Sequence, residues 1–227
     1  SQTVFGIYNM EQKILNKYQV KFLEIFAKEK ELTQKFYLSG GTALTAFYIP
    51  YRLSEDLDFF CEEEFDPQVI VVFLKKYKKE LGFKEFDYQK SFNRNLYFLK
   101  FNDYILKTEF TYYPFKQIEK SKAIITGIKI DSLFDIAVNK IFTIFQNPRT
   151  RDFIDLYLII KERDFDFFNL IKKARIKFDW HIDPIQLGAQ LMKTNELKDY
   201  PILIKKIDDN QWQSFYEKIA KKLGEKI

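Results

Sequence analysis

Hydrophobic and polar positions follow two different periods along the chain, and the change between them divides it in two. Up to about residue 128, short apolar runs typical of strands are interspersed with amphipathic helical segments. From Asp131 onward, apolar residues recur every three or four positions, which indicates helices alone. We therefore predict an α/β domain over residues 1–128 and a helical domain over residues 129–227.

The first domain is expected to contain three helices among its strands. One apolar stripe predicts a helix over residues 11–30, and a second, with lysines on its outer side, predicts a helix over Pro67–Leu81. A short helix is expected over Ala43–Tyr48, capped by Thr42 and ended near Pro50, because proline breaks a helix interior. The expected strands cover residues 36–38, 57–60, 83–86, 95–101 and 104–112.

The second domain is expected to be a bundle of helices. The predicted ranges are 132–146, 151–163, 167–177, 184–192 and 210–223.

The longest wholly apolar run, Val69–Leu74, is far shorter than the roughly 20 residues that cross a bilayer, so no membrane partner is expected. Residues Ser1–Met10 lack a basic segment followed by an apolar one, so we expect no secretory signal and a cytoplasmic protein.

Composition narrows the class of protein. Hydrophobic residues make up 46% and charged residues 30%, with 7 Gly and 6 Pro among 227, which excludes disordered and collagen-like chains. The single cysteine, Cys61, excludes an internal disulfide and a multi-cysteine zinc site. The single histidine, His181, argues against a multi-histidine metal centre and a histidine-dependent triad. The net charge of +5 is compatible with a nucleic-acid partner without demonstrating one.

A glycine turn is the first candidate for chemistry. The strand at residues 36–38 ends in Ser39-Gly40-Gly41, just before the short helix. Glycines let a backbone approach phosphate oxygens closely, and the start of a helix offers unpaired N–H groups with partial positive charge. Ser39 and Thr42 add hydroxyl donors. The turn therefore predicts a cradle for the phosphates of a nucleoside triphosphate (NTP).

A pair of carboxylates follows at the next strand. Asp56 and Asp58 lie two positions apart, so both side chains are expected on one side while Leu57 and Phe59 point to the core. Without a cation, each carboxylate raises the pKa of the other at a cost of about 1 kcal/mol or more. The pair therefore predicts a site for Mg²⁺ or Mn²⁺. Alone, either the turn or the pair is an ordinary loop feature, but together they favour nucleotidyl or phosphoryl transfer.

Glu109 is the candidate for a third carboxylate. Leu106, Thr108 and Phe110 share one face of the predicted strand, which leaves Lys107 and Glu109 on the other. Glu109 would complete the metal's ligands or activate an acceptor hydroxyl. An exposed strand face explains the same pattern equally well.

Two blocks of sequence resemble a known superfamily. The run L-S-G-G-T-A-L through Y-R-L-S-E-D-L-D-F-F resembles the polymerase-beta-like nucleotidyltransferases, and more narrowly the abortive-infection AbiEii/AbiGii (MenT-like) toxins of type IV toxin–antitoxin systems. The blocks D-I-A-V-N-K at 135–140 and R-T-R-D-F-I-D-L at 149–156 are similar to later motifs of that family. The resemblance implies an α+β fold, with a mixed, mainly antiparallel sheet flanked by helices, followed by a C-terminal helical bundle.

The resemblance also implies roles for individual residues. The glycine turn would bind phosphates and the aspartate pair would bind metal. Ser54 would lie in the active site, Lys140 would meet the triphosphate, and Arg151 would contact the nucleotide where the family often has lysine. Asp152 would be a late acid that orients Lys140 or activates the acceptor hydroxyl. From spacing alone, a lysine such as Lys140 is more often one whose stem packs on apolar neighbours, and Asp152 is equally a helix-start acid.

The function implied by the resemblance is metal-dependent transfer of a nucleoside monophosphate (NMP) from an NTP to an acceptor hydroxyl. A toxin role, tRNA or another RNA as acceptor, and a cognate antitoxin as partner are implied in the same way. Two alternatives stay open. One is a catalytically silent nucleotide-binding or interaction module of the same fold, and the other is an enzyme of that fold that modifies a protein. The sequence specifies neither the NTP nor the oligomeric state.

Overall fold

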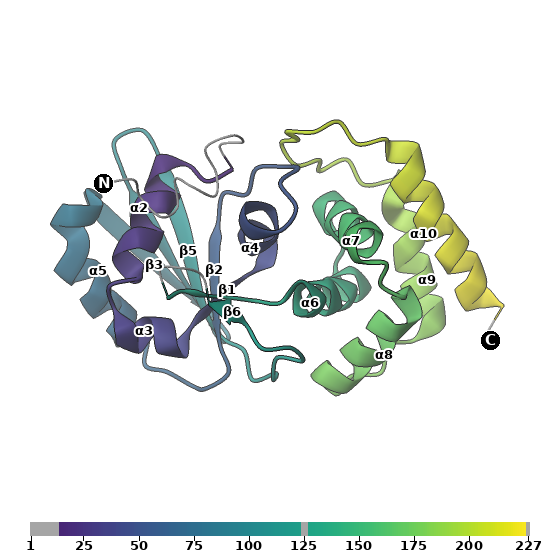
Figure 1. The fold of residues 1–227 in the computed structure, drawn as a ribbon, viewed down its shortest axis with the longest axis horizontal. Helices are drawn as coiled ribbons and strands as arrows, with labels where there is room; N and C mark the ends of the chain where they lie inside the picture. Colours follow the sequence, from purple (N-terminus) through teal and green to yellow (C-terminus); the bar gives the residue numbers. More distant parts are fainter. Residues whose placement is uncertain (1–13, 124–126, 226–227) are drawn as a thin grey trace. The chain divides into compact units, whose positions relative to one another are not determined.

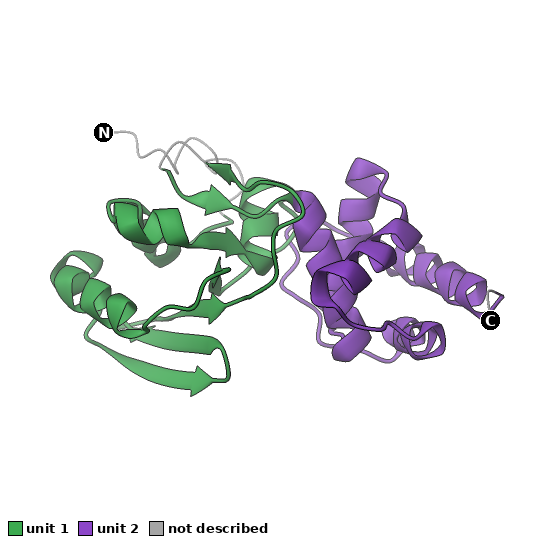
Figure 2. Ribbon diagram, turned by 90° about the horizontal axis from the view of Figure 1, so that it is seen from below, with its two compact units in different colours: residues 1–132 green, residues 133–227 purple. Residues whose placement is uncertain are grey.

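The structure is a computed structural model that describes residues 14–123 and 127–225. Its internal contacts divide the chain into two compact units, Ser1–Ser132 and Leu133–Ile227 (Figure 2). The first combines a sheet with helices and the second is helical, as the change in hydrophobic period predicts. Within the described ranges, every helix is too short or too polar to traverse a bilayer.

A mixed sheet forms the centre of the first unit. Its strands are β1 (Tyr37–Ser39), β2 (Leu57–Cys61), β3 (Glu85–Ser91), β4 (Arg94–Lys100), β5 (Ile105–Tyr112), β6 (Lys122–Ala123) and β7 (Lys129–Ile130). Across the described residues their order is β3-β4-β5-β2-β1-β7-β6. Only the β2–β5 and β1–β7 pairs in this order are parallel, so the predicted mixed, mainly antiparallel sheet is confirmed.

Helices cover the two faces of this sheet unequally. The helices α2 (Lys17–Phe26), α3 (Lys30–Lys35) and α5 (Gln68–Leu81) lie on one face, and α4 (Gly40–Phe47) lies on the other (Figure 1). The core under α2 is aromatic: Phe26 packs 4.5 Å from Phe59 and 5.8 Å from Phe73, measured between ring centroids. Phe59 in turn stacks on Phe110 at 4.8 Å. Because strand residues alternate between faces, Asp58 and Glu109 point away from this core.

Two local predictions in the first unit are wrong in detail. The helix predicted over 11–30, of which 11–13 lie outside the described residues, is in fact α2 followed by a separate α3. Asn16 sets the start of α2, because its side chain accepts from two backbone N–H groups while the Gln19 side chain accepts from the Asn16 N–H, forming a capping box. Thr42 does not cap α4, because β1 runs straight into that helix at Gly40 and Ser39 holds the cap position.

The described part of the second unit contains five α-helices, as predicted. They are α6 (Leu133–Gln146), α7 (Thr150–Arg163), α8 (Phe167–Phe178), α9 (Pro184–Met192) and α10 (Asp209–Gly224), with a 3₁₀ turn at Lys193–Asn195. Helix α10 docks on α7 through Tyr216, whose hydroxyl donates to the Phe153 carbonyl oxygen at 2.7 Å. The predicted C-terminal helical character is confirmed.

Candidate active site

The glycine turn is a tight junction between β1 and α4. Gly40 has a φ of +69°, in the left-handed region that costs other residues about 1 kcal/mol. A Cβ added at Gly40 would lie 2.6 Å from Oδ2 of Asp58. A Cβ added at Gly41 would lie 2.5 Å from Nη2 of Arg52 and 3.0 Å from Oγ of Ser54. The structure therefore brings the glycine turn against one of the two predicted aspartates and against Ser54.

We expect Gly40→Ala to destabilise the protein by about 2 kcal/mol, because alanine must adopt the left-handed conformation and its methyl group displaces the Asp58 carboxylate. Urea unfolding of the purified protein measures this. Gly82→Ala is the matched control, since Gly82 also has a positive φ of +85° but no heavy atom within 4 Å of an added Cβ. Equal losses in the two variants would contradict the close contact between Gly40 and Asp58.

Three carboxylates meet on the face of the sheet opposite the aromatic core. Asp58 of β2 lies directly beside Glu109 in the parallel pairing with β5, and Asp56 comes just before β2. Burial, together with the negative charges of Glu109 and Asp56, raises the pKa of Asp58 from 3.8 to about 7. The predicted repulsion between adjacent carboxylates is therefore present at Asp58.

Two cationic side chains balance the negative charges of Asp56 and Glu109. Nζ of Lys107 lies 2.8 Å from Oδ2 of Asp56. The Arg94 guanidinium binds the Glu109 carboxylate through two contacts of 2.7 and 2.6 Å, and the Thr111 hydroxyl donates to it at 2.8 Å. Burial alone would raise the pKa of Glu109, but the hydrogen bonds and charge of Arg94 outweigh it and hold that pKa below its ordinary value.

The donor set suits a hard divalent cation only in part. Asp56 and Asp58 offer carboxylate oxygens, the ligands that Mg²⁺ and Mn²⁺ prefer, and a cation there would relieve the repulsion that raises the pKa of Asp58. Both oxygens of Glu109 are engaged by Arg94, and Thr111 binds one of them as well, whereas Lys107 engages only Oδ2 of Asp56. In the part of the chain that the structure describes, no group of three His, Cys, Asp or Glu side chains is arranged to hold a metal ion. The residues that fit a metal are therefore Asp56 and Asp58.

The Ser39 and Thr42 hydroxyls, which were predicted to bind phosphate, form hydrogen bonds within the protein. Ser39 is buried and its Oγ donates to Oδ2 of Asp131 at 2.7 Å. Thr42 is also buried, and its hydroxyl donates to the backbone carbonyl of Asp56. Ser54 is half-buried, and its carbonyl accepts from the Gln19 side chain at 2.8 Å. Of these contacts, the Thr42 bond ties α4 to the aspartate pair, and the Ser39 bond ties β1 to the segment after β7. The backbone N–H groups at the start of α4 are therefore better candidates for phosphate contact than the Ser39 and Thr42 hydroxyls.

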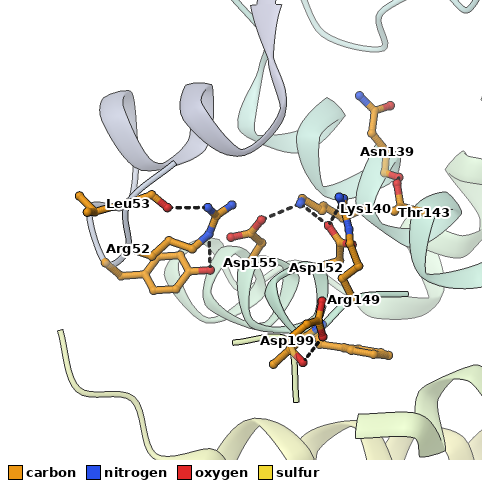
Figure 3. A network of polar contacts seen from close by, with 12 residues as sticks. Arg52, Leu53, Asn139, Lys140, Thr143, Arg149, Asp152, Asp155 and Asp199 are labelled. Carbon is orange, nitrogen blue, oxygen red and sulfur yellow. Dashed lines mark hydrogen bonds and ion pairs between the residues drawn. The ribbon is translucent and has the colours of Figure 1, made fainter. Parts of the chain in front are cut away.

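A second polar cluster lies within the helical unit (Figure 3). Nζ of Lys140, on α6, lies 2.6 Å from Oδ1 of Asp152 and 2.6 Å from Oδ2 of Asp155, both on α7. Arg149 binds the other oxygen of Asp152 at 2.8 Å. Burial alone would raise the pKa of Asp152, but the positive charges of Lys140 and Arg149 hold it below its ordinary value. The structure thus brings Lys140 and Asp152 together.

Several charged residues of these clusters were not among the sequence candidates. Arg94 and Lys107 reach their carboxylates through strand register, which spacing along one sequence does not reveal. Asp155 could have been found, because it lies three positions after Asp152 and so on the same face of a helix. Arg151, which was a candidate, lies half-buried on α7.

Comparisons with known proteins agree with the fold. The chain is 32% identical over 145 residues to the uncharacterized protein aq_aa25 of Aquifex aeolicus (strain VF5), a match that covers 63% of this chain and 66% of that relative. A candidate nucleotidyltransferase from H. pylori shares the fold with a TM-score of 0.62 at 21% identity, covering 93% of this chain and 97% of that one. JHP933 from Helicobacter pylori gives a TM-score of 0.61 at 20% identity, covering 94% of each chain.

A protein-family model also matches most of the chain. The model described as "Nucleotidyl transferase AbiEii toxin, Type IV TA system" matches residues 21–225, which includes the glycine turn, the aspartate pair and the Lys140 cluster. The likeness to solved structures confirms the predicted nucleotidyltransferase fold, and the family match confirms the resemblance carried by the two sequence blocks. The chain therefore belongs to the AbiEii nucleotidyl transferase family.

Proposed function

We propose that the chain transfers an NMP from an NTP to an acceptor hydroxyl, with release of pyrophosphate and with Mg²⁺ or Mn²⁺ at Asp56 and Asp58. The observation that carries this proposal is the approach of Gly40 to Asp58, where an added Cβ would lie 2.6 Å from the carboxylate. Phosphates bound at the start of α4 and a cation bound by the aspartates would then be neighbours. Membership of a nucleotidyl transferase family supports the same reaction.

In the proposed reaction, the site residues of the first unit have different roles. Backbone N–H groups at the start of α4 bind the triphosphate, and the two aspartates bind the cation. The divalent ion, when bound, neutralises charge on the α-phosphate and lowers the pKa of the attacking hydroxyl. Asp58 must be ionised to bind a cation, and because its pKa is about 7, cation affinity rises as the pH increases through neutrality. Glu109 is a weak candidate for accepting the proton of the hydroxyl, because Arg94 occupies both of its oxygens and lowers its pKa.

The finer parts of the proposal rest on the family. Its description supports a toxin role with an antitoxin as partner, and the net charge of +5 suits tRNA or another RNA as acceptor. Lys140 and Arg151 are assigned to nucleotide contact, and Asp152 to the orientation of Lys140. The 2.6 Å contact between Nζ of Lys140 and Oδ1 of Asp152 supports that last assignment.

The test is a label-transfer assay. The purified protein is incubated with total RNA and with each of the four α-³²P-labelled NTPs, once with Mg²⁺ and once with excess EDTA. We expect one or more nucleotides to label RNA with Mg²⁺ only, and label on the protein itself would instead favour the protein-modifying alternative. Lack of label on RNA and protein with every NTP, despite binding of NTP measured by calorimetry, would favour the silent binding module.

A pair of adjacent variants controls this assay. Asp56→Asn removes one proposed metal ligand, and we expect it to lower the rate on the order of 10²- to 10³-fold. Glu55→Gln removes the neighbouring carboxylate, which is exposed, and we expect it to leave the rate within about twofold of the wild type. Similar rates for Asp56→Asn and the wild type would remove Asp56 from the site.

A further inference from the structure

The segment that carries Asp56 lies outside the strand that carries Asp58. Residues 53–56 have no regular secondary structure, and β2 begins only at Leu57. Among the described residues, the pairing of β2 with β5 also starts at Leu57, so the pairing that sets Asp58 beside Glu109 does not include Asp56. A metal ligand has to be held within about 0.5 Å of its productive position. Contacts other than strand pairing therefore have to fix Asp56.

Gln19 of α2 holds this segment from one face of the sheet. Its Nε2 donates to the carbonyl oxygen of Ser54 at 2.8 Å and to that of Glu55 at 3.1 Å. Its Oε1 accepts from the backbone N–H of Asn16 at 3.0 Å, which orients the amide. Gln19 is 1% exposed, so water does not compete for these hydrogen bonds. The amide therefore joins the start of α2 to the two residues before Asp56.

Thr42 of α4 holds the same segment from the opposite face of the sheet (Figure 1). Its hydroxyl donates to the carbonyl oxygen of Asp56, and the residue is fully buried. Three consecutive carbonyl oxygens, those of residues 54–56, thus accept hydrogen bonds from buried side chains. The Asp56 carboxylate is held in addition by Lys107 at 2.8 Å. Both the backbone and the side chain of Asp56 are therefore fixed.

The place of Gln19 on its helix argues for a role beyond folding. The other buried residues of α2 are apolar, namely Phe22, Leu23, Ile25 and Phe26. An amide among them gains little net stability from its hydrogen bonds, but when all are satisfied it specifies one arrangement. A metal ligand needs such an arrangement, because a displacement of about 1 Å can lower a reaction rate about 100-fold.

We propose that Gln19 and Thr42 are positioning residues, which fix the backbone at Asp56 so that its carboxylate meets the divalent cation. This inference deepens the proposed function and rests on it, since Asp56 is one of the two proposed metal ligands. It also gives the Thr42 hydroxyl a role other than the phosphate contact expected from the sequence. Both side chains act through Asp56 and not through contact with the NTP or the acceptor.

The test is binding of Mn²⁺ to the purified protein without NTP or acceptor, measured by electron paramagnetic resonance of the free ion. Gln19→Met and Thr42→Val keep the approximate size of each side chain without its donor. We expect each to weaken Mn²⁺ binding about 10- to 100-fold, the loss typical when a group that orients a metal ligand is removed. Thr42→Ser keeps the hydroxyl and should bind Mn²⁺ within about threefold of the wild type.

Asn16→Ala is the matched control for loss of stability. The Asn16 side chain accepts hydrogen bonds from two backbone N–H groups at the start of α2, whereas the backbone N–H that orients Gln19 is retained in the variant. We expect Asn16→Ala to lower the thermal midpoint and to leave Mn²⁺ affinity unchanged. If Gln19 served only to start the helix, Asn16→Ala and Gln19→Met would have the same Mn²⁺ affinity.

A second titration separates positioning from phosphate contact at Thr42. Binding of NTP in excess EDTA, measured by calorimetry, involves no metal ligand. We expect Thr42→Val to bind metal-free NTP with the affinity of the wild type. Weaker binding of metal-free NTP, with wild-type Mn²⁺ affinity, would overturn the positioning role and return Thr42 to phosphate contact.

The outcomes for this inference and for the proposed reaction differ. Wild-type Mn²⁺ affinity in Gln19→Met or in Thr42→Val would overturn the role of that residue, even if the wild type transfers nucleotides. An equal loss of affinity in Asn16→Ala would overturn the role of Gln19. Weaker Mn²⁺ binding in both variants, in a wild type that transfers nothing, would support the inference and reject the proposed reaction. A wild type that binds no Mn²⁺ would reject both the inference and the proposed metal site.

Discussion

Replacing Asp58 by asparagine is expected to abolish nucleotidyl transfer and, without divalent cations, to stabilise the protein above neutral pH. The pKa of Asp58 is about 7 in the folded protein and 3.8 in its ordinary state. A raised pKa means that the stability contributed by this group is fully present below pH 4 and is lost as the pH rises through 7. Asparagine keeps the shape without the charge. After allowance for solvent screening, we expect the variant to gain about 2 kcal/mol at pH 8.

Two measurements separate the expected effects of Asp58→Asn. Urea unfolding in EDTA should show a gain over the wild type that grows between pH 5 and pH 8. The label-transfer rate should fall on the order of 10³-fold or more, because an amide cannot replace a carboxylate as a metal ligand. Asp87→Asn, which removes an exposed carboxylate on β3, should change neither quantity. A wild-type transfer rate in Asp58→Asn would reject the proposed site. If Asp58→Asn were less stable than the wild type at pH 8, the negative charges of Glu109 and Asp56 would not destabilise ionised Asp58.

Removing the Lys140 side chain is expected to destabilise the helical unit by about 3–5 kcal/mol. The Lys140 ammonium is the shared partner of Asp152 and Asp155, which are both fully buried. Lys140→Ala therefore leaves negative charge in the interior with one fewer cation to balance it. The sequence alone suggests a weaker triphosphate contact as the main effect, whereas the buried contacts make loss of stability the larger one.

The measurement is the free energy of unfolding in urea, followed by far-UV circular dichroism. Lys172→Ala is the matched control, because Lys172 is exposed on α8 and its removal should cost less than about 0.5 kcal/mol. Adding Asp155→Asn to Lys140→Ala should recover part of the loss, because it removes one of the buried charges that Lys140 balances. Equal stabilities for Lys140→Ala and Lys172→Ala would show that the buried contacts of Lys140 contribute nothing.

The sequence predicts the helical half of the chain better than the sheet. Each predicted end of α6 to α10 lies within one residue of the observed end, because the spacing of apolar residues in an amphipathic helix is a local signal. Strand β3 was predicted over 83–86 but runs from Glu85 to Ser91. Its side chains are nearly all exposed, so no alternation marks it, and only its pairing with β4 makes it a strand.

In the candidate site too, the local motifs could be predicted from the sequence, whereas the partners that depend on strand pairing could not. The glycine turn and the aspartate pair are short motifs, and their proximity follows from the antiparallel pairing that places Ser39 opposite Asp58. The hydroxyl roles predicted for Ser39 and Thr42 could not be judged from the sequence, because their partners depend on which strands meet. The same is true of Arg94, which reaches Glu109 from a neighbouring strand fifteen residues earlier in the chain.

The pairing of Lys107 with Asp56 and of Arg94 with Glu109 has a physiological consequence. These built-in counter-ions let the acidic end of the sheet fold before any divalent ion arrives. The amount of folded protein then does not depend on the supply of divalent ions, and in the proposed reaction only turnover depends on it. Under the proposed function, chelation should leave an intact but inactive molecule that regains activity as soon as the ion returns, without a refolding delay.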